Sequence, residues 1–569
     1  MKRWIVCAHL KNNRKKFIML PVYPVNRYNP DYTERLLALV GNADCRYILI
    51  SKFLHRIGSL WVLAGSNCLK ENMNMADTDY DVIVVGAGNA AACAALAAQD
   101  AGADRIVMLE RAPEDEAGGN TRFTAGAMRV VYDGVEDIKK LVELSNQEIA
   151  DTDFGTYTQD QFFDDIFRVT QFRTDPDMAE ILVTRSLETL TWMREKGIRF
   201  VPIYGRQAFK IDGKFKFWGG LTVETWGGGP GLYEAQQEIT KKNDIQTMFD
   251  TRAMSLMFDG AKVTGVRIKQ GSQVKELNCK SVVMASGGFQ ANPEWRTRYL
   301  GPGWDLAKIR GTRFNTGDGI RMATDIGAAT YGNWSGCHAV GWDRNAPEFG
   351  DLAVGDQFQK HSYPFFVMVN ATGKRFVDEG ADFRNYTYAK YGRVILEQPA
   401  QFAWQVLDAK VAHLKRDEYS IRQVTKVTAD TVEELADKLE GVDKEAFLKE
   451  IADYNAAVRQ DIEYNPNVKD GRCTEGLEIN KSNWAQTIDT APFEAYQVTC
   501  GVTFTFGGLR INTDGQVVDT DLIPMEGLFA AGECVGGLFY FNYPGGSGLT
   551  AGSVFGKLAG ASAGAAASD

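Results

Sequence analysis

Residues Tyr80–Arg111 read YDVIVVGAGNAAACAALAAQDAGADRIVMLER and decide the fold. The stretch predicts a buried strand, a glycine turn, an alanine-rich helix and a second strand that ends on an acidic residue. Gly86 and Gly88 would let the backbone turn tightly against a pyrophosphate, which the helix N-terminus would face. Glu110, 22 residues after Gly88, is placed to accept hydrogen bonds from a ribose hydroxyl pair. These features predict a dinucleotide-binding βαβ unit.

The third glycine of the usual motif is replaced by Ala91, so the pattern is GxGxxA. A small residue is tolerated there, because the position is where the helix contacts the strand. The motif alone would also suit an ordinary glycine turn in an α/β protein. The strand, helix and acidic residue around it favour the dinucleotide site.

The composition indicates a globular protein of several domains. With 569 residues, the chain is too long for one hydrophobic core. The nine cysteines show no CxxC or CxxCH spacing, and only His338, His361 and His413 follow Met75. This pattern argues against iron–sulfur clusters, c-type haem, zinc and other metal sites. We therefore expect no metal site and one organic cofactor.

The N-terminal segment differs from the rest. Residues 1–74 carry 12 Lys or Arg and 4 acidic residues, a net charge of +8. Because the whole chain has a net charge of −10, the remainder has a net charge of −18. Such an acidic main body disfavours a nucleic-acid partner. The most apolar part, Tyr47–Gly65, is interrupted by basic residues and makes a poor membrane span or signal peptide. Because Met75 stands just before the first strand, we expect 1–76 to be an extension outside the functional fold, with a membrane-associating basic presequence as the alternative.

Glycine-rich loops recur before and after a different central region. They lie at 118–126, 286–288, 315–319, 532–533 and 545–548. The central region, 333–500, has more aromatic residues and a polar helical stretch from Thr431 to Arg459. We therefore predict an α/β protein whose Rossmann-like cofactor domain has two parts, 77–332 and 501–569, separated by an inserted domain over 333–500.

Several strings together resemble the flavoprotein subunits of the fumarate reductase and succinate dehydrogenase family. They are VIVVGAGNAA, GGNTRFTAG, ASGGFQANPEW, NTGDGI and GLFAAGECVGG, and the resemblance covers essentially all of 77–569. Within the family, GGFQANPEWRTRYLGPGWDLAKIRGTRFNTGDGIRMA and GGLFYFNYPGGSGLTAGSVFG are most similar to the FAD-dependent tricarballylate dehydrogenases. The resemblance implies a discontinuous FAD-binding domain of the GR2 type with an inserted α+β capping domain.

The resemblance also implies which residues hold FAD. Members that attach FAD covalently carry a histidine where this chain has Asn120, so we expect non-covalent FAD. The implied cofactor residues are Gly86, Gly88, Ala91, Glu110, Gly119, Asn120, Thr121, Gly126, Gly287, Asp318, Gly532, Glu533, Ser547 and Leu549.

Four residues are carried over as the catalytic set. Arg384 corresponds to the family's proton-transferring arginine, although it follows the segment Val369–Glu379 by five residues rather than the family's four. His338 matches the substrate-binding histidine. Thr503 and Tyr543 stand where fumarate-reducing members place a histidine and an arginine, so the substrate pocket is expected to be rebuilt.

Other assignments near the site stay open. Arg384 could instead be a surface arginine paired with Asp382 or Glu379, and Arg375 is expected to be structural. The family's Glu/Arg proton relay is not visible, because the aligned positions fall near Gln359 and Ser362, so a proton would leave by another route such as His361 or ordered water. Further candidates for binding a third carboxylate are Tyr540, Arg310 and Arg313.

The resemblance implies a dehydrogenase that oxidises a CH–CH bond next to carboxylates, with tricarballylate converted to cis-aconitate. A hydride would pass to flavin N5, and Arg384 would accept the proton. The expected partner is a membrane iron–sulfur and haem protein that reoxidises FADH₂, which places the chain in the cytoplasm, peripheral at the inner membrane face. The alternatives are a fumarate reductase-like enzyme, a 3-ketosteroid 1-dehydrogenase-like enzyme and a flavin electron-transfer subunit of a cobalamin-pathway protein.

Overall fold

A computed structural model describes residues 3–11, 14–22, 78–217 and 220–568. The chain divides into two units, Met1–Asn74 and Met75–Asp569. In the first unit, strands β1 (Arg3–Lys11) and β2 (Arg14–Val22) pair antiparallel. The rest of the predicted extension over 1–76 lies outside the described residues, so its role stays a prediction.

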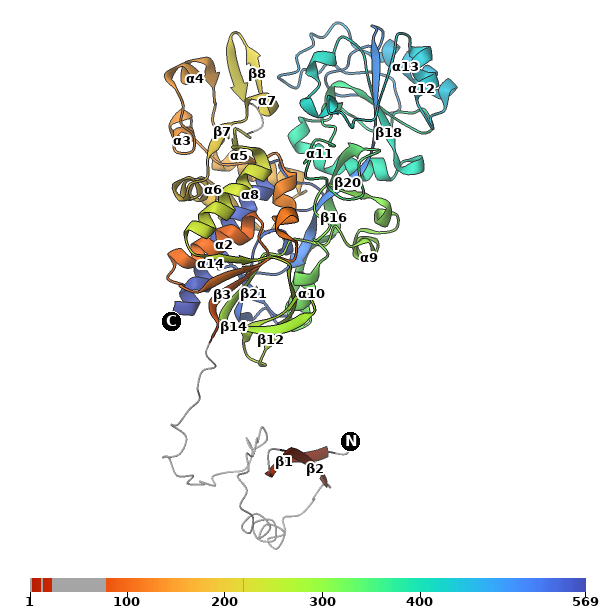
Figure 1. Cartoon of the computed structure of the whole chain (residues 1–569). Coiled ribbons are helices and arrows are strands. Elements are labelled where there is room, and N and C mark those ends of the chain that lie inside the picture. The colour runs from red at the N-terminus through yellow and green to blue at the C-terminus, as the bar shows by residue number, and fades with distance from the viewer. Residues whose placement is uncertain (1–2, 12–13, 23–77, 218–219, 569) are drawn as a thin grey trace. The chain divides into compact units, whose positions relative to one another are not determined.

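A parallel sheet lies at the base of the second unit in Figure 1. In spatial order its strands are β11 (Gln246–Met248), β4 (Ile106–Leu109), β3 (Tyr80–Val85), β14 (Gln273–Met284) and β22 (Pro524–Ala530). The apolar run Val82–Val85 of β3 is buried, as expected for a central parallel strand. Because β22 comes from the C-terminal part of the chain, the sheet joins the two ends of the predicted cofactor region.

Antiparallel strands extend this sheet. Strands β12 (Thr251–Phe258) and β13 (Val263–Gln270) form a meander with the first half of β14, and β21 (Gln516–Val518) pairs with β22. The segment after Ile245 is therefore β-rich, from β11 to β14.

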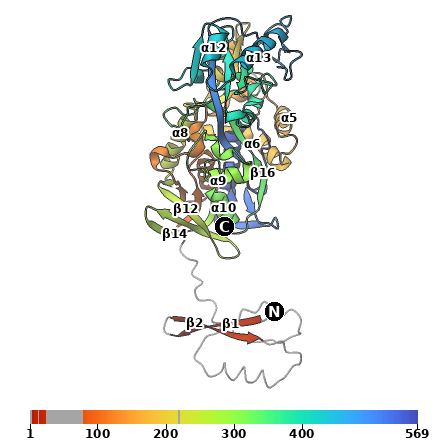
Figure 2. The same cartoon turned by 90° about the vertical axis from the view of Figure 1, so that its right-hand side faces the viewer.

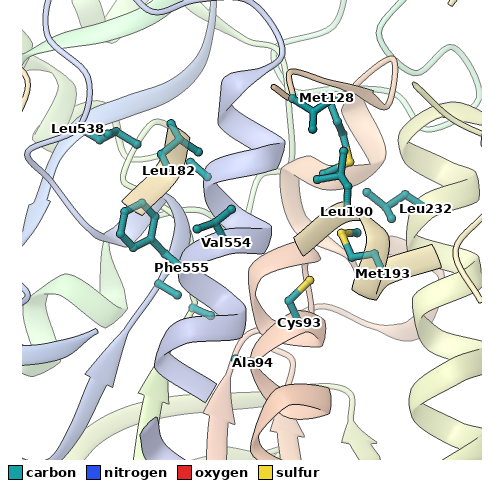
Figure 3. Close-up of a cluster of buried hydrophobic side chains, with 14 of the residues drawn as sticks. Cys93, Ala94, Met128, Leu182, Leu190, Met193, Leu232, Leu538, Val554 and Phe555 are labelled. Carbon is teal, nitrogen blue, oxygen red and sulfur yellow. The ribbon is translucent and has the colours of Figure 1, made fainter. Parts of the chain in front are cut away.

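Helix α2 (Asn89–Asp100) packs closely against the C-terminal helix α14 (Ser547–Ser568). The approach depends on glycines of α14 spaced four residues apart: a Cβ on Gly556, Gly560 or Gly564 would lie 2.6, 2.1 or 2.4 Å from a backbone oxygen of α2. Figure 3 shows Cys93 and Ala94 of α2 beside Val554 and Phe555 of α14, with side chains of α6 (Pro176–Lys196) and α8 (Gly228–Lys242) around them. This packing fixes the N-terminus of α2 against the sheet.

The substitution Gly560→Leu is expected to destabilise the protein by about 3 kcal/mol or more, because the helices would have to separate. The matched substitution Ala565→Leu lies on the exposed face of the same helix and should change the free energy of unfolding by less than about 0.5 kcal/mol. Urea denaturation of both variants measures the difference. Equal stabilities would contradict this account of the helix contact.

A second sheet is built mainly from the central region of the chain. Its order is β15 (Lys308–Ile309), β20 (Phe493–Leu509), β18 (Ala403–Leu407) and β17 (Val367–Asn370), and β16 (Thr330–Asp343) and β19 (Lys426–Ala429) also pair with β20. The predicted domain boundaries at 332/333 and 500/501 fall within β16 and β20, which pair antiparallel along most of their lengths. These two long strands run continuously from the cofactor region into the central one.

Three helices accompany the second sheet: α11 (Tyr388–Leu396), α12 (Val432–Lys438) and α13 (Lys444–Ala457). The polar helical stretch predicted over 431–459 is confirmed, as two helices rather than one. In both views, α12 and α13 lie at the opposite end of the second unit from β12 and β14 (Figures 1 and 2).

The segment between β4 and β11 adds two small sheets, ordered β5-β10-β7 and β6-β9-β8. No helix in the described ranges is long and apolar enough to cross a membrane. The remaining elements are α3 (Val135–Lys139), α4 (Asn146–Asp151), α5 (Gln159–Val169), α7 (Tyr204–Gln207), α9 (Pro293–Trp295), α10 (Asp318–Thr324), β5 (Ala127–Met128), β6 (Thr152–Asp153), β7 (Phe200–Pro202), β8 (Ala208–Ile211), β9 (Lys214–Phe217) and β10 (Val223–Thr225).

Candidate active site

The glycine turn between β3 and α2 forms one end of the site. Gly86 has a φ of +119°, and a Cβ there would lie 2.3 Å from the carbonyl oxygen of Ala285, so only glycine fits. At the start of α2, the amide of Asn89 donates to Thr121 Oγ1 at 2.9 Å. The predicted βαβ turn is confirmed, and Thr121 is joined directly to it.

Glu110 follows β4 and is buried at the same end. Its Oε1 accepts a hydrogen bond from the Ala112 amide at 2.8 Å. Burial raises the pKa of Glu110, although nearby backbone amides act in the opposite direction. A buried carboxylate in this position suits hydroxyl donors such as those of a ribose.

A pocket extends from the glycine turn to the second sheet, and most of the predicted cofactor residues line it. Ala91 instead packs in the core, and Ser547 is buried with its hydroxyl donating to the Pro544 carbonyl oxygen at 2.5 Å. Gly126 also lies outside the lining, which its neighbours Ala125 and Ala127 form. The predicted residues that line the pocket are Gly86, Gly88, Glu110, Gly119, Asn120, Thr121, Gly287, Asp318, Gly532, Glu533 and Leu549.

Two of these lining residues hold loops in place. The Asn120 side-chain amide donates to the Thr503 carbonyl oxygen, while its Oδ1 accepts from the Thr312 amide at 3.0 Å. Asp318, at the start of α10, forms ion pairs with Arg111 at 3.0 Å and Arg252 at 2.9 Å. Asn120 therefore joins the 3₁₀ turn Gly119–Phe123 to β20, and Asp318 is neutralised by two arginines at the pocket wall.

Glu533 lies where β22 ends and is held by hydrogen bonds from two sides. Its Oε1 accepts from the Thr505 amide at 2.9 Å, and its Oε2 accepts from Gln290 Nε2 at 3.2 Å. Burial raises the pKa of Glu533 to about 7.

This raised pKa predicts a pH-dependent stability. Because the carboxyl pKa is about 7 in the folded protein and 4.5 in its ordinary state, folding binds a proton between these pH values. The free energy of unfolding should therefore fall as the pH rises from about 4.5 to 7. The variant Glu533→Gln cannot ionise, so it should lose this slope and gain up to about 3 kcal/mol over the wild type at pH 8. Denaturation at several pH values tests this, with exposed Glu526→Gln as the control; an unchanged slope in Glu533→Gln would be the contrary result.

The geometry of this end fits FAD. Gly287 has a φ of +74°, and a Cβ there would meet the Asn315 side chain at 2.6 Å, so the wall at this point is bare backbone. The buried Ser286 hydroxyl also lines the pocket and has no hydrogen-bond partner within the described part of the chain. A backbone-lined cradle, an acidic residue at one end and an unpaired hydroxyl match the needs of a bound dinucleotide.

His338 lies on β16 at the other end of the pocket and is 1 % exposed. Neither ring nitrogen has a hydrogen-bond partner among the described residues. The ring packs against Tyr388 and Tyr543, with centroids at 4.9 and 4.8 Å. Burial, together with Arg310, holds the pKa of His338 well below its ordinary value. The neutral imidazole can therefore donate one hydrogen bond to a ligand in the pocket.

Arg384 also lines the pocket, at the start of a 3₁₀ turn that ends at Tyr386. Its guanidinium carbon lies 5.4 Å from the centre of the Tyr388 ring, and its Nε has no hydrogen-bond partner among residues 78–217 and 220–568. Burial lowers its pKa. This arrangement suits a group that acts on a ligand.

The alternative assignment of Arg384 depended on pairing with one of two nearby acidic residues. Those carboxylates have other partners: Asp382 pairs with Arg168 at 2.8 Å, and Glu379 pairs with Arg375 at 2.6 Å. The buried Arg375–Glu379 pair agrees with the structural role expected for Arg375.

Asp356 joins two arginines at the pocket wall, and neither Asp356 nor Arg206 was predicted. Its Oδ2 lies 3.4 Å from Arg206 Nη1 and 3.6 Å from Arg310 Nη2, and Arg310 Nη1 reaches Thr503 Oγ1 at 3.4 Å. No motif marks Arg206, which lies on the short helix α7 directly after β7. Arg313, a candidate for binding a third carboxylate, is instead exposed and pairs with Glu116 at 2.6 Å.

Aromatic and polar side chains complete this end of the pocket. The hydroxyls of Tyr388 and Tyr543 are hydrogen-bonded to each other, and the His361 ring lies 4.9 Å from that of Tyr388. Burial, then Arg384 and other arginines, holds the pKa of His361 well below its ordinary value. Gln359 and His361 line the pocket, whereas the hydroxyl of Ser362 donates to the Leu414 carbonyl oxygen at 3.2 Å. Tyr540, predicted as a further carboxylate ligand, lies outside the lining.

Three comparisons with known proteins agree with this geometry. A family model described as "FAD binding domain" matches residues 81–549. The chain is 29 % identical over 497 residues to an NADH:fumarate oxidoreductase of Klebsiella pneumoniae, covering 85 % of this chain and 48 % of that protein. It is 26 % identical over 484 residues to a fumarate reductase (cytochrome) of Shewanella frigidimarina, covering 84 % of this chain and 76 % of that one. The chain thus spans about half the length of the first relative and three quarters of the second.

Solved structures show the same fold. The open conformation of a flavocytochrome c3 fumarate reductase matches with a TM-score of 0.64 and 27 % identity, covering 87 % of this chain and 79 % of that chain. A 3-ketosteroid delta1-dehydrogenase from Sterolibacterium denitrificans matches with a TM-score of 0.66 and 21 % identity, over 86 % of this chain and 100 % of that chain, a likeness of fold alone. The chain therefore belongs to the FAD-binding-domain family, its cofactor is FAD, and fumarate reductases are among the proteins it is similar to.

Proposed function

We propose that the protein oxidises a CH–CH bond next to carboxylates, and that the reaction is tricarballylate to cis-aconitate. The observation that carries the proposal is the set of three arginines, Arg206, Arg310 and Arg384, at one end of the pocket. Asp356 offsets one of these charges, and the buried neutral imidazole of His338 adds a hydrogen-bond donor. Such a pocket suits a small polyanion with several carboxylates.

The cofactor would be held without a covalent bond. The glycine turn at Gly86 and Gly88 would receive the pyrophosphate, and Glu110 the ribose. The amide of Asn120 is hydrogen-bonded on both sides and offers no nucleophile for attachment to a flavin. When bound, FAD supplies a hydride acceptor.

The chain's own residues would bind the substrate and move its proton. His338 would donate to one carboxylate, and Arg310, fixed by Asp356, would bind another. Arg384 would accept the proton from the carbon next to the one that loses hydride. Burial lowers the pKa of Arg384, which reduces the cost of using a guanidinium as a base.

A reductase that acts on the double bond of a polycarboxylate is the second candidate. The same cationic pocket would bind a product such as cis-aconitate, and the relatives named above are fumarate reductases. A steroid is a poorer candidate, because the arginines and Asp356 in the lining would be left without partners beside an apolar ligand. An electron-carrying subunit without its own substrate would not need the unpaired His338.

We further propose that a separate protein exchanges electrons with the flavin. The sequence holds no CxxCH or CxxC motif, so any haem or iron–sulfur cluster would belong to a partner. A membrane iron–sulfur and haem protein is the partner that fits the resemblance, and it would place this chain at the cytoplasmic membrane face.

A dye-linked assay tests the reaction and its direction. Purified protein with FAD is expected to reduce an artificial acceptor with tricarballylate and to form cis-aconitate, which chromatography identifies. Succinate and a 3-ketosteroid should give little turnover. Rapid reduction of cis-aconitate or fumarate by reduced viologen, with no oxidation of tricarballylate, would instead support the reductase.

A further inference from the structure

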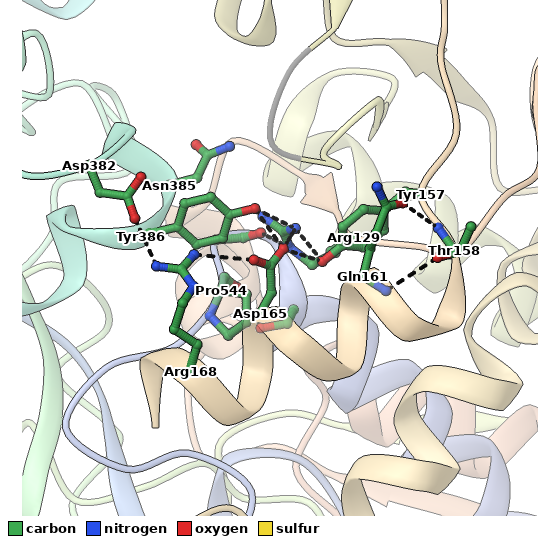
Figure 4. Close-up of polar contacts among 12 residues, drawn as sticks. Arg129, Tyr157, Thr158, Gln161, Asp165, Arg168, Asp382, Asn385, Tyr386 and Pro544 are labelled. Atoms are coloured by element: carbon green, nitrogen blue, oxygen red, sulfur yellow. Dashed lines mark hydrogen bonds and ion pairs between the residues drawn. The ribbon is translucent and has the colours of Figure 1, made fainter. Parts of the chain in front are cut away.

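We propose that Asp165 and Arg168 of α5 are positioning residues for Arg384, because they fix both sides of the turn that carries it (Figure 4). The inference rests on the proposed role of Arg384 in catalysis. Helix α5 belongs to the N-terminal part of the chain, whereas the turn belongs to the central region. The contact therefore links two parts of the chain that both border the pocket.

The first contact lies on the C-terminal side of the turn. The hydroxyl of Tyr386 donates to Asp165 Oδ2 at 2.7 Å. The Tyr386 ring is 8 % exposed, and burial raises the pKa of its phenol to about 12. The phenol therefore stays protonated and remains a donor to the carboxylate at neutral pH.

The second contact lies on the N-terminal side. Arg168 Nη1 donates to Asp382 Oδ2 at 2.8 Å, and Arg168 Nη2 reaches Asp165 Oδ1 at 3.2 Å. Asp382 and Tyr386 each stand two residues from Arg384, on opposite sides. Asp165 and Arg168 are three residues apart and so lie on one face of α5. One helical turn of α5 thus holds both flanks of the catalytic arginine.

The turn itself offers little support to Arg384. It is a three-residue 3₁₀ segment, closed by hydrogen bonds such as that from the Thr387 amide to the Arg384 carbonyl oxygen at 3.1 Å. The Nε of Arg384 has no hydrogen-bond partner in the described part of the chain. The direction of the guanidinium then depends on the backbone position and on the Tyr388 ring, whose centre lies 5.4 Å from the guanidinium carbon. A displacement near 1 Å at a reacting group lowers catalytic rates by about 100-fold.

Asp165 is in turn held in place by Tyr157, which contacts the buried Arg129. Arg129 is fully buried; its Nε donates to the Gly545 carbonyl oxygen at 2.8 Å and its Nη1 to the Tyr157 hydroxyl at 2.8 Å. The Tyr157 hydroxyl donates to the same oxygen of Asp165 that Tyr386 uses, also at 2.7 Å. Figure 4 shows these side chains converging on Asp165.

The two tyrosines provide a matched experiment in the FAD-bound enzyme. Both phenols are buried and donate to Asp165 Oδ2 at 2.7 Å, but only Tyr386 lies on the turn of Arg384. We expect Tyr386→Phe to lower kcat by about 10-fold or more, with KM changed by less than about 3-fold. Tyr157→Phe should lose similar thermal stability and keep kcat within about 3-fold of the wild type, because Arg129 at 3.5 Å and Arg168 at 3.2 Å still hold Asp165. Equal kcat values in the two variants would overturn the proposal.

A charge pair offers a second comparison. Asp382 contacts both Arg168, at 2.8 Å, and the exposed Lys469, at 3.5 Å. Arg168→Gln should lower kcat several-fold, whereas Lys469→Gln should leave it unchanged. A larger loss of kcat in Lys469→Gln than in Arg168→Gln would argue against a role for α5.

A readout without turnover separates this inference from the proposed function. Hydrogen–deuterium exchange in the peptide spanning 382–388 should be faster in Tyr386→Phe than in Tyr157→Phe. If the wild type acts on no polycarboxylate in either direction, the proposed function fails. The exchange difference would still support the positioning of the Arg384 turn by Asp165 and Arg168. Equal exchange in the two variants would overturn this positioning role of Asp165 and Arg168, whatever the substrate.

Discussion

Arg384→Lys is expected to abolish turnover while FAD stays bound. Arg384 lines the pocket at the end that also holds His338, and lysine keeps a positive charge there but loses the planar guanidinium and its reach. If the guanidinium accepts the substrate proton, kcat should fall by about 10³-fold or more. The dye-linked rate measures this loss, and the absorbance of the protein-bound flavin shows that the cofactor remains.

The control for this variant is Arg313→Lys. Arg313 is exposed and pairs with Glu116, so the change should leave kcat unaltered. A wild-type rate in Arg384→Lys would end the assignment of Arg384 as the proton acceptor. A loss of flavin from the variant would show instead that Arg384 serves mainly to hold the cofactor site together.

Arg206→Gln is expected to weaken binding of a tricarboxylate selectively. Arg206 lies at the pocket wall with Arg310, and both approach Asp356. If the two arginines bind the carboxylate that distinguishes tricarballylate from succinate, the loss of one charge-assisted pair should raise the KM for tricarballylate by about 10- to 100-fold. Any residual rate with succinate should change by less than about 3-fold.

The matched substitution Arg313→Gln removes an arginine outside the pocket and should alter neither KM value. An equal rise in KM for both substrates in Arg206→Gln would show that the residue contributes to the general charge of the pocket. No change in either KM value would exclude Arg206 from substrate binding.

The sequence predicted the cofactor half of the fold well because that half depends on short-range patterns. The turn at Gly86 needs a positive φ and bare backbone, and both requirements are visible in the residue type. The return of the chain through β22 was expected from the second set of glycine loops. The close approach of α14 to α2 has a local signal too, in glycines spaced by four.

The end of the pocket around His338 and Arg384 was harder to predict, because its residues meet only through the tertiary fold. Arg206 and Asp356 are 150 residues apart, and no local pattern marks either. The same holds for Asp165 and Tyr386, which come from different parts of the chain. The domain boundaries were placed by composition, which changes near 333 and 500, whereas β16 and β20 continue through both positions because they pair with each other.

Anaerobic titration of the FAD-bound protein tests the central claim most directly. Adding tricarballylate without any electron acceptor should bleach the flavin absorbance, with cis-aconitate formed in the same amount as reduced flavin. Succinate and a 3-ketosteroid should leave the spectrum of the oxidised flavin in place. Bleaching by either of these, or none by tricarballylate, would contradict the account of a pocket built for three carboxylates.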